Sequence, residues 1–158
     1  MIEQDVLDYI KEHGIRQRPH KYETFMNIAR EFEKQSSCLR NQFGTIIVTS
    51  DLTKILSIGY NGQYKNGPNH CQSLAQGQCR CVHSEANAII KYPYGMCNDA
   101  IMFVTGNPCV ACSALIINAG IKTVIYDREY TSDNFEGLNL LKGVNLDIKK
   151  LSEVINSK

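Results

Sequence analysis

The sequence predicts a single α/β domain in which helices and strands alternate along the chain. Its 158 residues suffice for one compact domain, and 43% hydrophobic with 21% charged residues is the composition of a globular protein. Short runs of β-branched residues alternate with segments of helical periodicity. That order is typical of a layered α/β architecture.

The first 38 residues are predicted to be helical. An apolar stripe within residues 2–10 ends at Gly14, and a second helix can open at Pro19. Apolar residues recur in this second helix at roughly helical spacing, which predicts a face packed on the core. We expect residues 1–18 to form a helical extension and residues 19–158 to form the main domain.

The rest of the chain reads as strands and helices around one long loop. The runs 45–48 and 55–58 are short β-type segments separated by Ser50-Asp51, which indicates a hairpin. The stretch 61–80 is polar and rich in Gly, Asn and Gln, which predicts a loop. Beyond it the sequence predicts helix 84–91, strand 101–104, helix 109–119, strand 122–126, a helix near 133–142, a strand near 144–148 and a last polar helix.

Two segments place potential metal ligands where a loop turns into a predicted helix. One contains His83 and Glu85, and the other contains Pro108, Cys109 and Cys112. One imidazole and two thiolates give Zn²⁺ three protein ligands and leave a fourth position for water, which is the pattern of a catalytic site. The sequence therefore predicts that His83, Cys109 and Cys112 bind zinc.

Glu85 is the candidate catalytic residue. It lies two residues after His83, near a helix N-terminus, and can reach the open side of the metal. A carboxylate there can take a proton from zinc-bound water, whose pKa falls to about 7, and pass it to a ring nitrogen and the departing amine. His-x-Glu followed by Pro-Cys-x-x-Cys is the signature of zinc-dependent nucleobase deaminases. A lone Cys-x-x-Cys could be a redox pair or half of a structural zinc site, but the joint pattern disfavours both.

These motifs give the chain a resemblance to the deoxycytidylate (dCMP) deaminases. It resembles them over segments 37–44, 59–62, 83–89, 105–112 and 114–126. The resemblance implies a three-layer cytidine-deaminase-like sandwich with a five-stranded mixed sheet. It implies hydrolysis of dCMP to dUMP and ammonia by zinc-bound hydroxide, which supplies dUMP for thymidylate synthesis. It also implies homo-oligomers, often hexamers, and dCTP and dTTP as effectors.

The same resemblance assigns contacts to the nucleotide. Asn61 would bind a sugar hydroxyl and Arg40 the 5′-phosphate, although Arg40 could also be a surface charge. Further substrate-binding candidates are Ser84, Thr105 and Pro108, and the effector-site candidates are Gly59, Tyr60, Asn61 and Gly62.

The chain departs from the family pattern at several positions near these candidates. Phe43 stands where a valine is usual, and Gly106-Asn107 replaces a more apolar pair. Ser84 and Ala86 stand where the family more often has alanine and a bulky residue. These changes leave the chemistry intact but bear on which substrate is preferred.

The chain has seven cysteines, and without an export signal they favour metal ligation or free thiols over disulfides. Some dCMP deaminases bind a second, structural zinc, which four protein ligands would close and which would order the long polar loop. The alternative is free thiols in a flexible loop. Cys97 has no partner by pattern. The ligands that the resemblance implies are Cys38, His70, Cys79 and Cys81, with Cys71 as an alternative to Cys79.

Charge and composition favour a small-molecule substrate. Lys and Arg number 17 against 16 Asp and Glu, and tryptophan is absent. Proteins that hold polynucleotides usually have a basic groove with stacking aromatics, so we expect no nucleic acid partner. The N-terminus lacks the apolar run of a signal peptide, and no stretch reaches the roughly 20 apolar residues of a membrane span. We therefore expect no membrane partner and a cytoplasmic location.

Two alternative functions stay open. One is deamination of another cytosine compound, such as dCTP or deoxycytidine, or of a base in a nucleic acid. The other is a non-catalytic zinc-binding module that senses nucleotides. Such a module would tolerate loss of Glu85, which is present in register.

Overall fold

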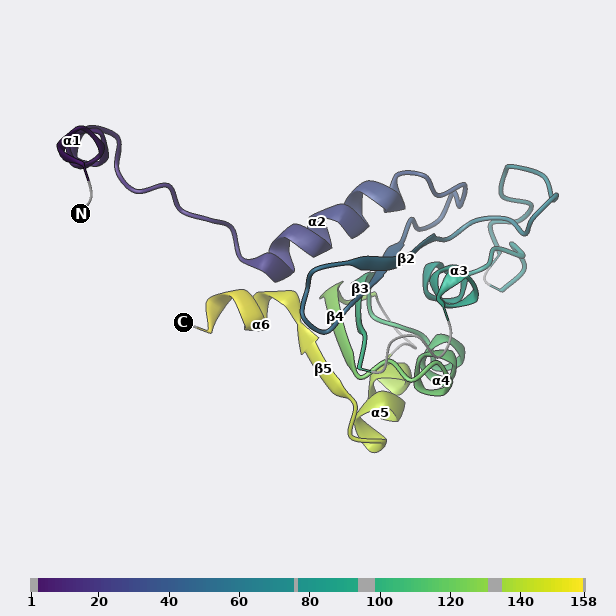
Figure 1. Cartoon of the computed structure of the whole chain (residues 1–158). Coiled ribbons are helices and arrows are strands. Elements are labelled where there is room, and N and C mark those ends of the chain that lie inside the picture. The colour runs from purple at the N-terminus through teal and green to yellow at the C-terminus, as the bar shows by residue number, and fades with distance from the viewer. Residues whose placement is uncertain (1–2, 76, 94–98, 131–134, 158) are drawn as a thin grey trace.

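The computed structural model describes residues 3–75, 77–93, 99–130 and 135–157. It contains a five-stranded sheet of order β2-β1-β3-β4-β5 (Figure 1). In chain order the elements are α1 (Gln4–His13), α2 (Lys21–Glu33), β1 (Gly44–Val48), β2 (Ile55–Tyr60), α3 (Ser84–Lys91), β3 (Ile101–Gly106), α4 (Val110–Asn118), β4 (Thr123–Arg128), α5 (Phe135–Gly143), β5 (Asp147–Lys150) and α6 (Leu151–Asn156).

The sheet is mixed, as expected. Strand β1 pairs antiparallel with both β2 and β3, whereas β3, β4 and β5 run parallel. A parallel pair needs a crossover connection, and α4 and α5 provide these after β3 and β4. The α/β class and the five-stranded mixed sheet are thereby confirmed.

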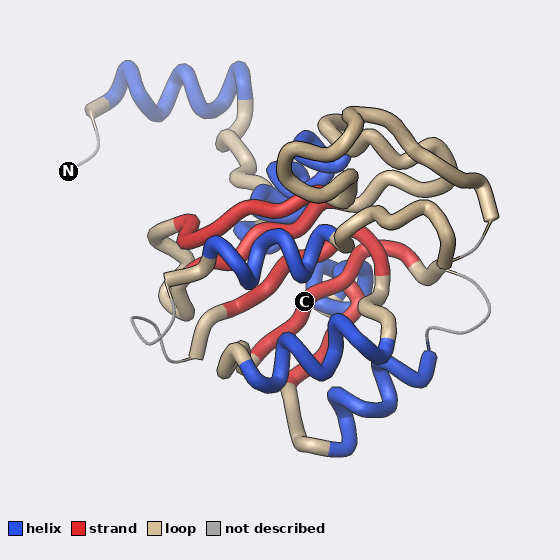
Figure 2. The backbone as a smooth tube through the Cα atoms, turned by 90° about the vertical axis from the view of Figure 1, so that its right-hand side faces the viewer, coloured by secondary structure: helices blue, strands red, loops and turns tan. Residues whose placement is uncertain are grey.

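Helices cover both faces of the sheet, which gives three layers (Figures 1 and 2). Successive side chains of a strand point to opposite faces, so neighbouring residues enter different cores. Ile46 packs in a cluster with Met26 of α2 and Leu151 of α6. Ile47 packs in the other cluster, with Ala88 of α3 and Ile116 of α4. Every residue of β1 and β3 is buried, because these central strands are covered on both sides.

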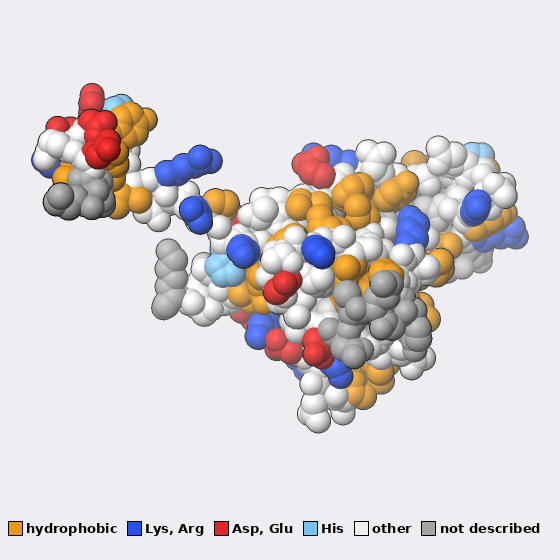
Figure 3. Space-filling view, viewed as in Figure 1, with side chains coloured by type: hydrophobic (Ala, Val, Ile, Leu, Met, Phe, Trp, Pro, Cys, Tyr) orange, Lys and Arg blue, Asp and Glu red, His pale blue; other side chains and the backbone are white. Residues whose placement is uncertain are grey.

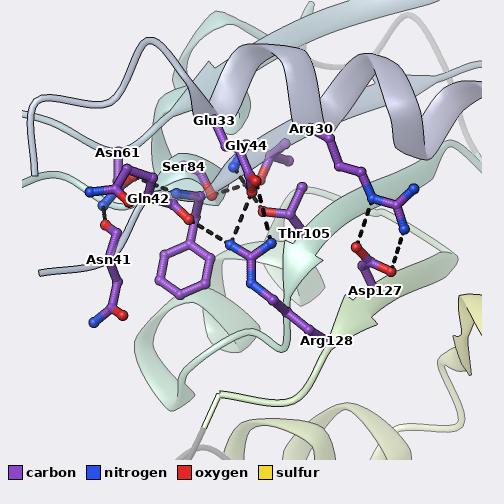
Figure 4. Close-up of polar contacts among 12 residues, drawn as sticks. Arg30, Glu33, Asn41, Gln42, Gly44, Asn61, Ser84, Thr105, Asp127 and Arg128 are labelled. Atoms are coloured by element: carbon purple, nitrogen blue, oxygen red, sulfur yellow. Dashed lines mark hydrogen bonds and ion pairs between the residues drawn. The ribbon is translucent and has the colours of Figure 1, made fainter.

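Ion pairs fix α2 over β4, as Figure 4 shows. The guanidinium of Arg30 donates from Nε and Nη2 to the two carboxylate oxygens of Asp127, at 2.8 and 2.7 Å. Arg128 pairs with Glu33 at 3.0 Å and also donates to the carbonyl of Gln42 at 2.7 Å. The second arginine therefore holds the chain segment that leads into β1.

The C-terminal elements differ slightly from the sequence expectation. The strand expected near 144–148 lies at Asp147–Lys150, because α5 continues to Gly143 and a turn with Asn145 at φ 57° follows it. The first residues expected for the preceding helix, 133–134, lie outside the described residues, as does Cys97.

Helix α1 stands apart from the sheet and its covering helices (Figures 1 and 3). None of its residues is buried, and Gly14 ends it with a φ of 76°. Whether residues 1–18 form a separate extension to a domain of residues 19–158 stays a prediction. Within the described residues, no helix combines the length and apolar character needed to cross a membrane.

We predict that Gly44 is required for the packing of α2 on β1. A Cβ atom added there would lie 2.0 Å from the carbonyl oxygen of Ala29 and 2.8 Å from the backbone nitrogen of Glu33. Because both neighbours are helix backbone, Gly44→Ala should lower the free energy of unfolding by about 1–3 kcal/mol, measured by urea denaturation. The control is Gly143→Ala, whose added Cβ would meet nothing within 4 Å. Equal stability of the two variants would contradict this packing.

Candidate metal and catalytic site

The site forms where several strand ends and two helix N-termini meet. Because β1 is antiparallel to its neighbours, its first residues lie beside the last residues of β2 and β3, as the pairs Gly44–Tyr60 and Thr45–Val104 show. The chain leaving β2 leads through a long loop into α3, and the chain leaving β3 leads directly into α4. His83 is the N-cap of α3 and Cys109 is the N-cap of α4.

The predicted metal ligands come together at these two helix N-termini. Nδ1 of His83 lies 3.5 Å from the sulfurs of both Cys109 and Cys112. Two ligands of one tetrahedral zinc, at about 2.3 Å for sulfur and about 2.05 Å for nitrogen, would lie about 3.5 Å apart. These three residues therefore have the donor set and the spacing to hold a zinc ion.

The electrostatics of these three residues favour a thiolate at Cys109. A hydrogen bond from the Cys112 thiol, together with His83, lowers the pKa of Cys109 to about 4. The backbone N–H of Cys112 also points at this sulfur, at 3.5 Å, in the first turn of α4. The pKa of His83 rises to about 9, mainly through its hydrogen bond to Cys109. The pKa of Cys112 is raised by its hydrogen bond to Cys109 and by burial. The Cys109 thiolate therefore provides a negative charge that can bind a metal cation.

Glu85 lies in the first turn of α3 and is 5% exposed. Burial raises its pKa, while backbone hydrogen bonding and the charge of His83 act in the opposite direction. Its Oε2 accepts a hydrogen bond from the Ser84 hydroxyl at 2.9 Å, and Ser84 in turn accepts from the Thr45 hydroxyl at 2.8 Å. A carboxylate with a raised pKa, held in one orientation, is suited to moving protons near neutral pH.

A cavity of about 350 Å³ lies against the metal ligands and Glu85. A small-molecule site typically has about 300–1,000 Å³. His83, Cys109 and Glu85 form part of its wall, and the substrate candidates Asn61 and Arg40 form another part. The residues that complete the wall are Cys38, Asn41, Phe43, Gly77, Cys79, Arg80, Cys81, Gly106, Asn107 and Tyr130.

Asn61 holds the cavity wall in shape. Its Oδ1 accepts from the backbone N–H of Phe43 at 2.8 Å, and its Nδ2 donates to the carbonyl of Asn41 at 2.7 Å (Figure 4). An amide oxygen has two lone pairs and an amide nitrogen two hydrogens, so Asn61 keeps capacity for a ligand.

Three substrate candidates are buried and do not line this cavity, so their contact with the substrate stays a prediction. Ser84 is fully buried between Thr45 and Glu85, so its hydroxyl orients the carboxylate. Thr105 is also fully buried, and its hydroxyl accepts from the backbone N–H of Gly44 at 3.1 Å. Pro108 is buried, and its carbonyl faces the backbone of Gly137 in α5.

The effector-site candidates lie in different surroundings, and their role stays a prediction. Gly59 packs against α3, where an added Cβ would lie 2.1 Å from the carbonyl oxygen of Ser84. Tyr60 is exposed, with the Lys91 ammonium 5.8 Å from its ring centre. Gly62 pairs with Val82 in an isolated bridge. Of the four candidates, only Asn61 lines the cavity.

Four cysteine sulfurs form a second group at the base of the long loop. Cys38, Cys71, Cys79 and Cys81 lie with all sulfurs within 4.8 Å of one another, which suits a tetrahedral zinc with four thiolate ligands. The expected ligand His70 is not in this group. Its side chain is exposed, and the neighbouring Cys71 takes the fourth place. The backbone N–H of Cys81 and the guanidinium of Arg40 lower the pKa of Cys79.

Some cavity residues were not singled out from the sequence. Arg80 lies between two cysteines of the second group, a position that carried no motif of its own. Tyr130 follows β4, and its ring packs edge-on against Phe43 with centroids 5.5 Å apart. Its backbone N–H donates to Oδ1 of Asn107 at 2.6 Å. A hydrogen-bonding side chain at 107 was visible in the sequence only as a departure from the family pattern.

Comparison with known proteins agrees with this geometry. Residues 19–128 match the family model of the cytidine and deoxycytidylate deaminase zinc-binding region. The chain is 32% identical over 127 residues to the deoxycytidylate deaminase of Mycobacterium phage D29, covering 71% of this chain and 98% of that protein. It is 28% identical over 155 residues to the deoxycytidylate deaminase of Schizosaccharomyces pombe, covering 90% of this chain, but it spans only 47% of that longer relative.

A solved structure gives the same result. The dCMP deaminase of cyanophage S-TIM5, in complex with dCMP and dUMP, superposes with a TM-score of 0.75 at 28% identity, covering 86% of this chain and all of that one. With the matching family model over most of its length and the ligand geometry described above, the chain belongs to the cytidine and deoxycytidylate deaminase family.

Proposed function

We propose that this protein hydrolyses dCMP to dUMP and ammonia. The observation that carries the proposal is a buried carboxylate, Glu85, beside the His83, Cys109 and Cys112 ligand set, in a cavity that also exposes Arg40. Membership of the family supports the chemistry. The names of the phage and yeast relatives, and the ligands of the S-TIM5 structure, support dCMP as the substrate.

His83, Cys109 and Cys112 would hold the catalytic zinc. Zinc bound there would lower the pKa of a coordinated water to about 7 and thus supply a nucleophile at neutral pH. Glu85 would accept the proton that the attacking water loses and deliver it to the ring nitrogen. It would then take the proton of the added hydroxyl group and deliver it to the amine, which leaves as ammonia when the carbonyl forms. A C–O bond forms and the C–N bond to the amino group breaks, so dCMP and water become dUMP and ammonia.

The other residues of the cavity would bind and orient the nucleotide. Asn61, with both ends of its amide already fixed by backbone, would offer its remaining donor and acceptor to a sugar hydroxyl. Arg40 would hold the 5′-phosphate, because its guanidinium borders the cavity and a planar fork of N–H donors suits phosphate oxygens. Cys38, Cys71, Cys79 and Cys81 would hold a second, structural zinc.

Deamination of another cytosine compound, dCTP or deoxycytidine, uses the same chemistry and is separated by the assay below. The buried, hydrogen-bonded Glu85 favours turnover over a nucleotide-sensing module. Regulation by dCTP and dTTP, a homo-oligomer such as a hexamer, and a cytoplasmic location stay predictions from the sequence.

We predict that the enzyme prefers the 5′-monophosphate. Loss of cytosine absorbance, followed on dCMP, CMP, deoxycytidine and dCTP, should give a kcat/KM for dCMP about 10- to 150-fold above that for deoxycytidine. The reason is that a charge-assisted hydrogen bond to phosphate contributes about 1.5–3 kcal/mol. Equal values for dCMP and deoxycytidine would remove the phosphate contact from the proposal, and a higher value for dCTP would replace dCMP as the substrate.

We predict that Glu85→Gln abolishes most of the activity while zinc stays bound. General acid–base catalysis contributes about 10²–10⁴-fold, so kcat on dCMP should fall by at least that factor. Zinc per chain, measured by elemental analysis, should match the unmodified enzyme, whereas Cys109→Ser should lose the catalytic ion. If Glu85→Gln also loses zinc, the carboxylate is a ligand and the assigned roles are wrong.

We predict that Ser84→Ala moves the acidic limb of the pH profile to higher pH. Burial raises the pKa of Glu85 above the ordinary value of a glutamate, and the hydrogen bond from the Ser84 hydroxyl to its carboxylate lowers that pKa. Without that bond the pKa of Glu85 rises further. The carboxylate is then protonated, and activity is lost, at a higher pH when the enzyme is acidified. Profiles of kcat/KM should show this shift for Ser84→Ala but not for Ser57→Ala, whose hydroxyl donates to the carbonyl of Ala88 instead. Identical acidic limbs would contradict the assignment.

A further inference from the structure

The four-cysteine group is part of the cavity wall and not a remote structural element. Three of its members, Cys38, Cys79 and Cys81, line the same cavity as His83 and Glu85. Two arginines that border this cavity, Arg40 and Arg80, are both attached to the group. Because both arginines are attached to the group, the cysteines can determine the positions of the two guanidinium groups.

Arg40 is held by the group through a direct contact. It follows Cys38 by two residues, and its Nη2 donates to the sulfur of Cys79 at 3.7 Å. Its Nε is buried and has no hydrogen-bond partner among the described residues. A guanidinium has five N–H donors, so most of its binding capacity is left for an anion.

Arg80 is held through its backbone. It stands between Cys79 and Cys81, and its φ of 54° is in the left-handed region, which is unfavourable for a residue with a side chain. Such a conformation persists where the surroundings fix it. Here both flanking residues direct their sulfurs into the group. The amide of Gln63 adds support by donating to the carbonyl of Cys79 at 2.7 Å.

The charges on the wall of the cavity suit a phosphorylated ligand. Among the described residues that line it, Arg40 and Arg80 are the arginines and Glu85 is the one carboxylate. Two guanidinium groups on one cavity wall suit a phosphate dianion, and Glu85 lines the same cavity beside the metal ligands.

We propose that the four-cysteine group, when it holds zinc, positions Arg40 and Arg80 as the joint binding site for the 5′-phosphate of the nucleotide. Loading of Cys38, Cys71, Cys79 and Cys81 then sets the affinity for phosphorylated ligands and leaves the recognition of the base unchanged. This proposal rests on the proposed function, because it assumes a 5′-nucleotide in the cavity.

The alternative explanation is that Arg40 only neutralises the cysteine group. Four thiolates around Zn²⁺ carry a net double negative charge, and a neighbouring guanidinium offsets part of it. That role needs no ligand and does not involve Arg80. If it is the only role, substitution of either arginine leaves the affinity for a phosphorylated ligand unchanged, whereas our proposal predicts that the affinity falls.

The test is to measure binding of dUMP and deoxyuridine to the zinc-loaded enzyme by calorimetry, with zinc counted in each sample. Arg40→Ala and Arg80→Ala should each weaken dUMP binding about 10-fold or more at unchanged zinc content. Cys71→Ser removes a ligand that does not border the cavity, so it should lose one zinc and weaken dUMP binding to a similar extent. Deoxyuridine affinity should stay within about twofold throughout. The matched control, His70→Ala, changes the exposed neighbour of Cys71 and should match the unmodified enzyme in both measurements.

Each contradicting result points to a different part of the argument. If the unmodified enzyme binds dUMP and deoxyuridine equally, phosphate recognition fails and with it the dCMP assignment. If Arg40→Ala and Arg80→Ala bind dUMP normally, these arginines are not its phosphate site. If Cys71→Ser loses zinc but binds dUMP normally, the coupling is wrong while the proposed function stands. If Cys71→Ser does not fold, zinc can instead be removed in part from the unmodified enzyme with a chelator. The affinity for dUMP should then fall when the cysteine group loses its ion.

Discussion

The structure depends on the meeting of two helix N-termini over one end of the sheet. At that point α3 contributes His83 and Glu85, and α4 contributes the sulfurs of Cys109 and Cys112. The positive ends of the two helices stabilise negative charge, which is why a buried carboxylate and a thiolate can lie so close together. The charge that remains attracts a cation. The spacing of 3.5 Å between Nδ1 of His83 and each sulfur shows that the site is already arranged for one.

The antiparallel placement of β1 links this site to the rest of the cavity. The start of β1 lies beside the ends of β2 and β3, so the segment before β1 faces the two helix N-termini. Thr45 of β1 then joins the site directly through the hydrogen-bond chain to Ser84 and Glu85. Asn61, at the end of β2, fixes the segment before β1 through its amide. The orientation of the Glu85 carboxylate therefore depends on the sheet as well as on its own helix.

The sequence was informative where a local rule determines geometry and uninformative where the chain is irregular. The clustering of His83, Cys109 and Cys112 near Glu85 could be predicted because each motif lies at a helix start, where spacing fixes position. The burial of Ser84 and Thr105 could not be predicted, because a motif marks nearby residues without showing which side chains point into the cavity. His70 and Cys71 are adjacent in a loop with no periodicity, so only the structure could show that the cysteine turns inward. Arg80 needed its left-handed backbone and the position of both neighbours, neither of which a sequence displays.

Two departures from the family pattern turn out to be one structural change. The ring of Phe43 lies where a Cβ at position 106 would stand, since that atom would be 2.4 Å from Cε1 of the ring. A side chain at position 106 would therefore force the Phe43 ring to move. The ring is held from two other sides, by Tyr130 edge-on and by the Arg128 guanidinium 5.3 Å from its centre. Arg128 also pairs with Glu33 of α2. The part of the cavity wall formed by Phe43 is therefore connected to helix α2 through this arginine. A ligand in this cavity thus meets an aromatic ring that is held in place by Tyr130 and Arg128.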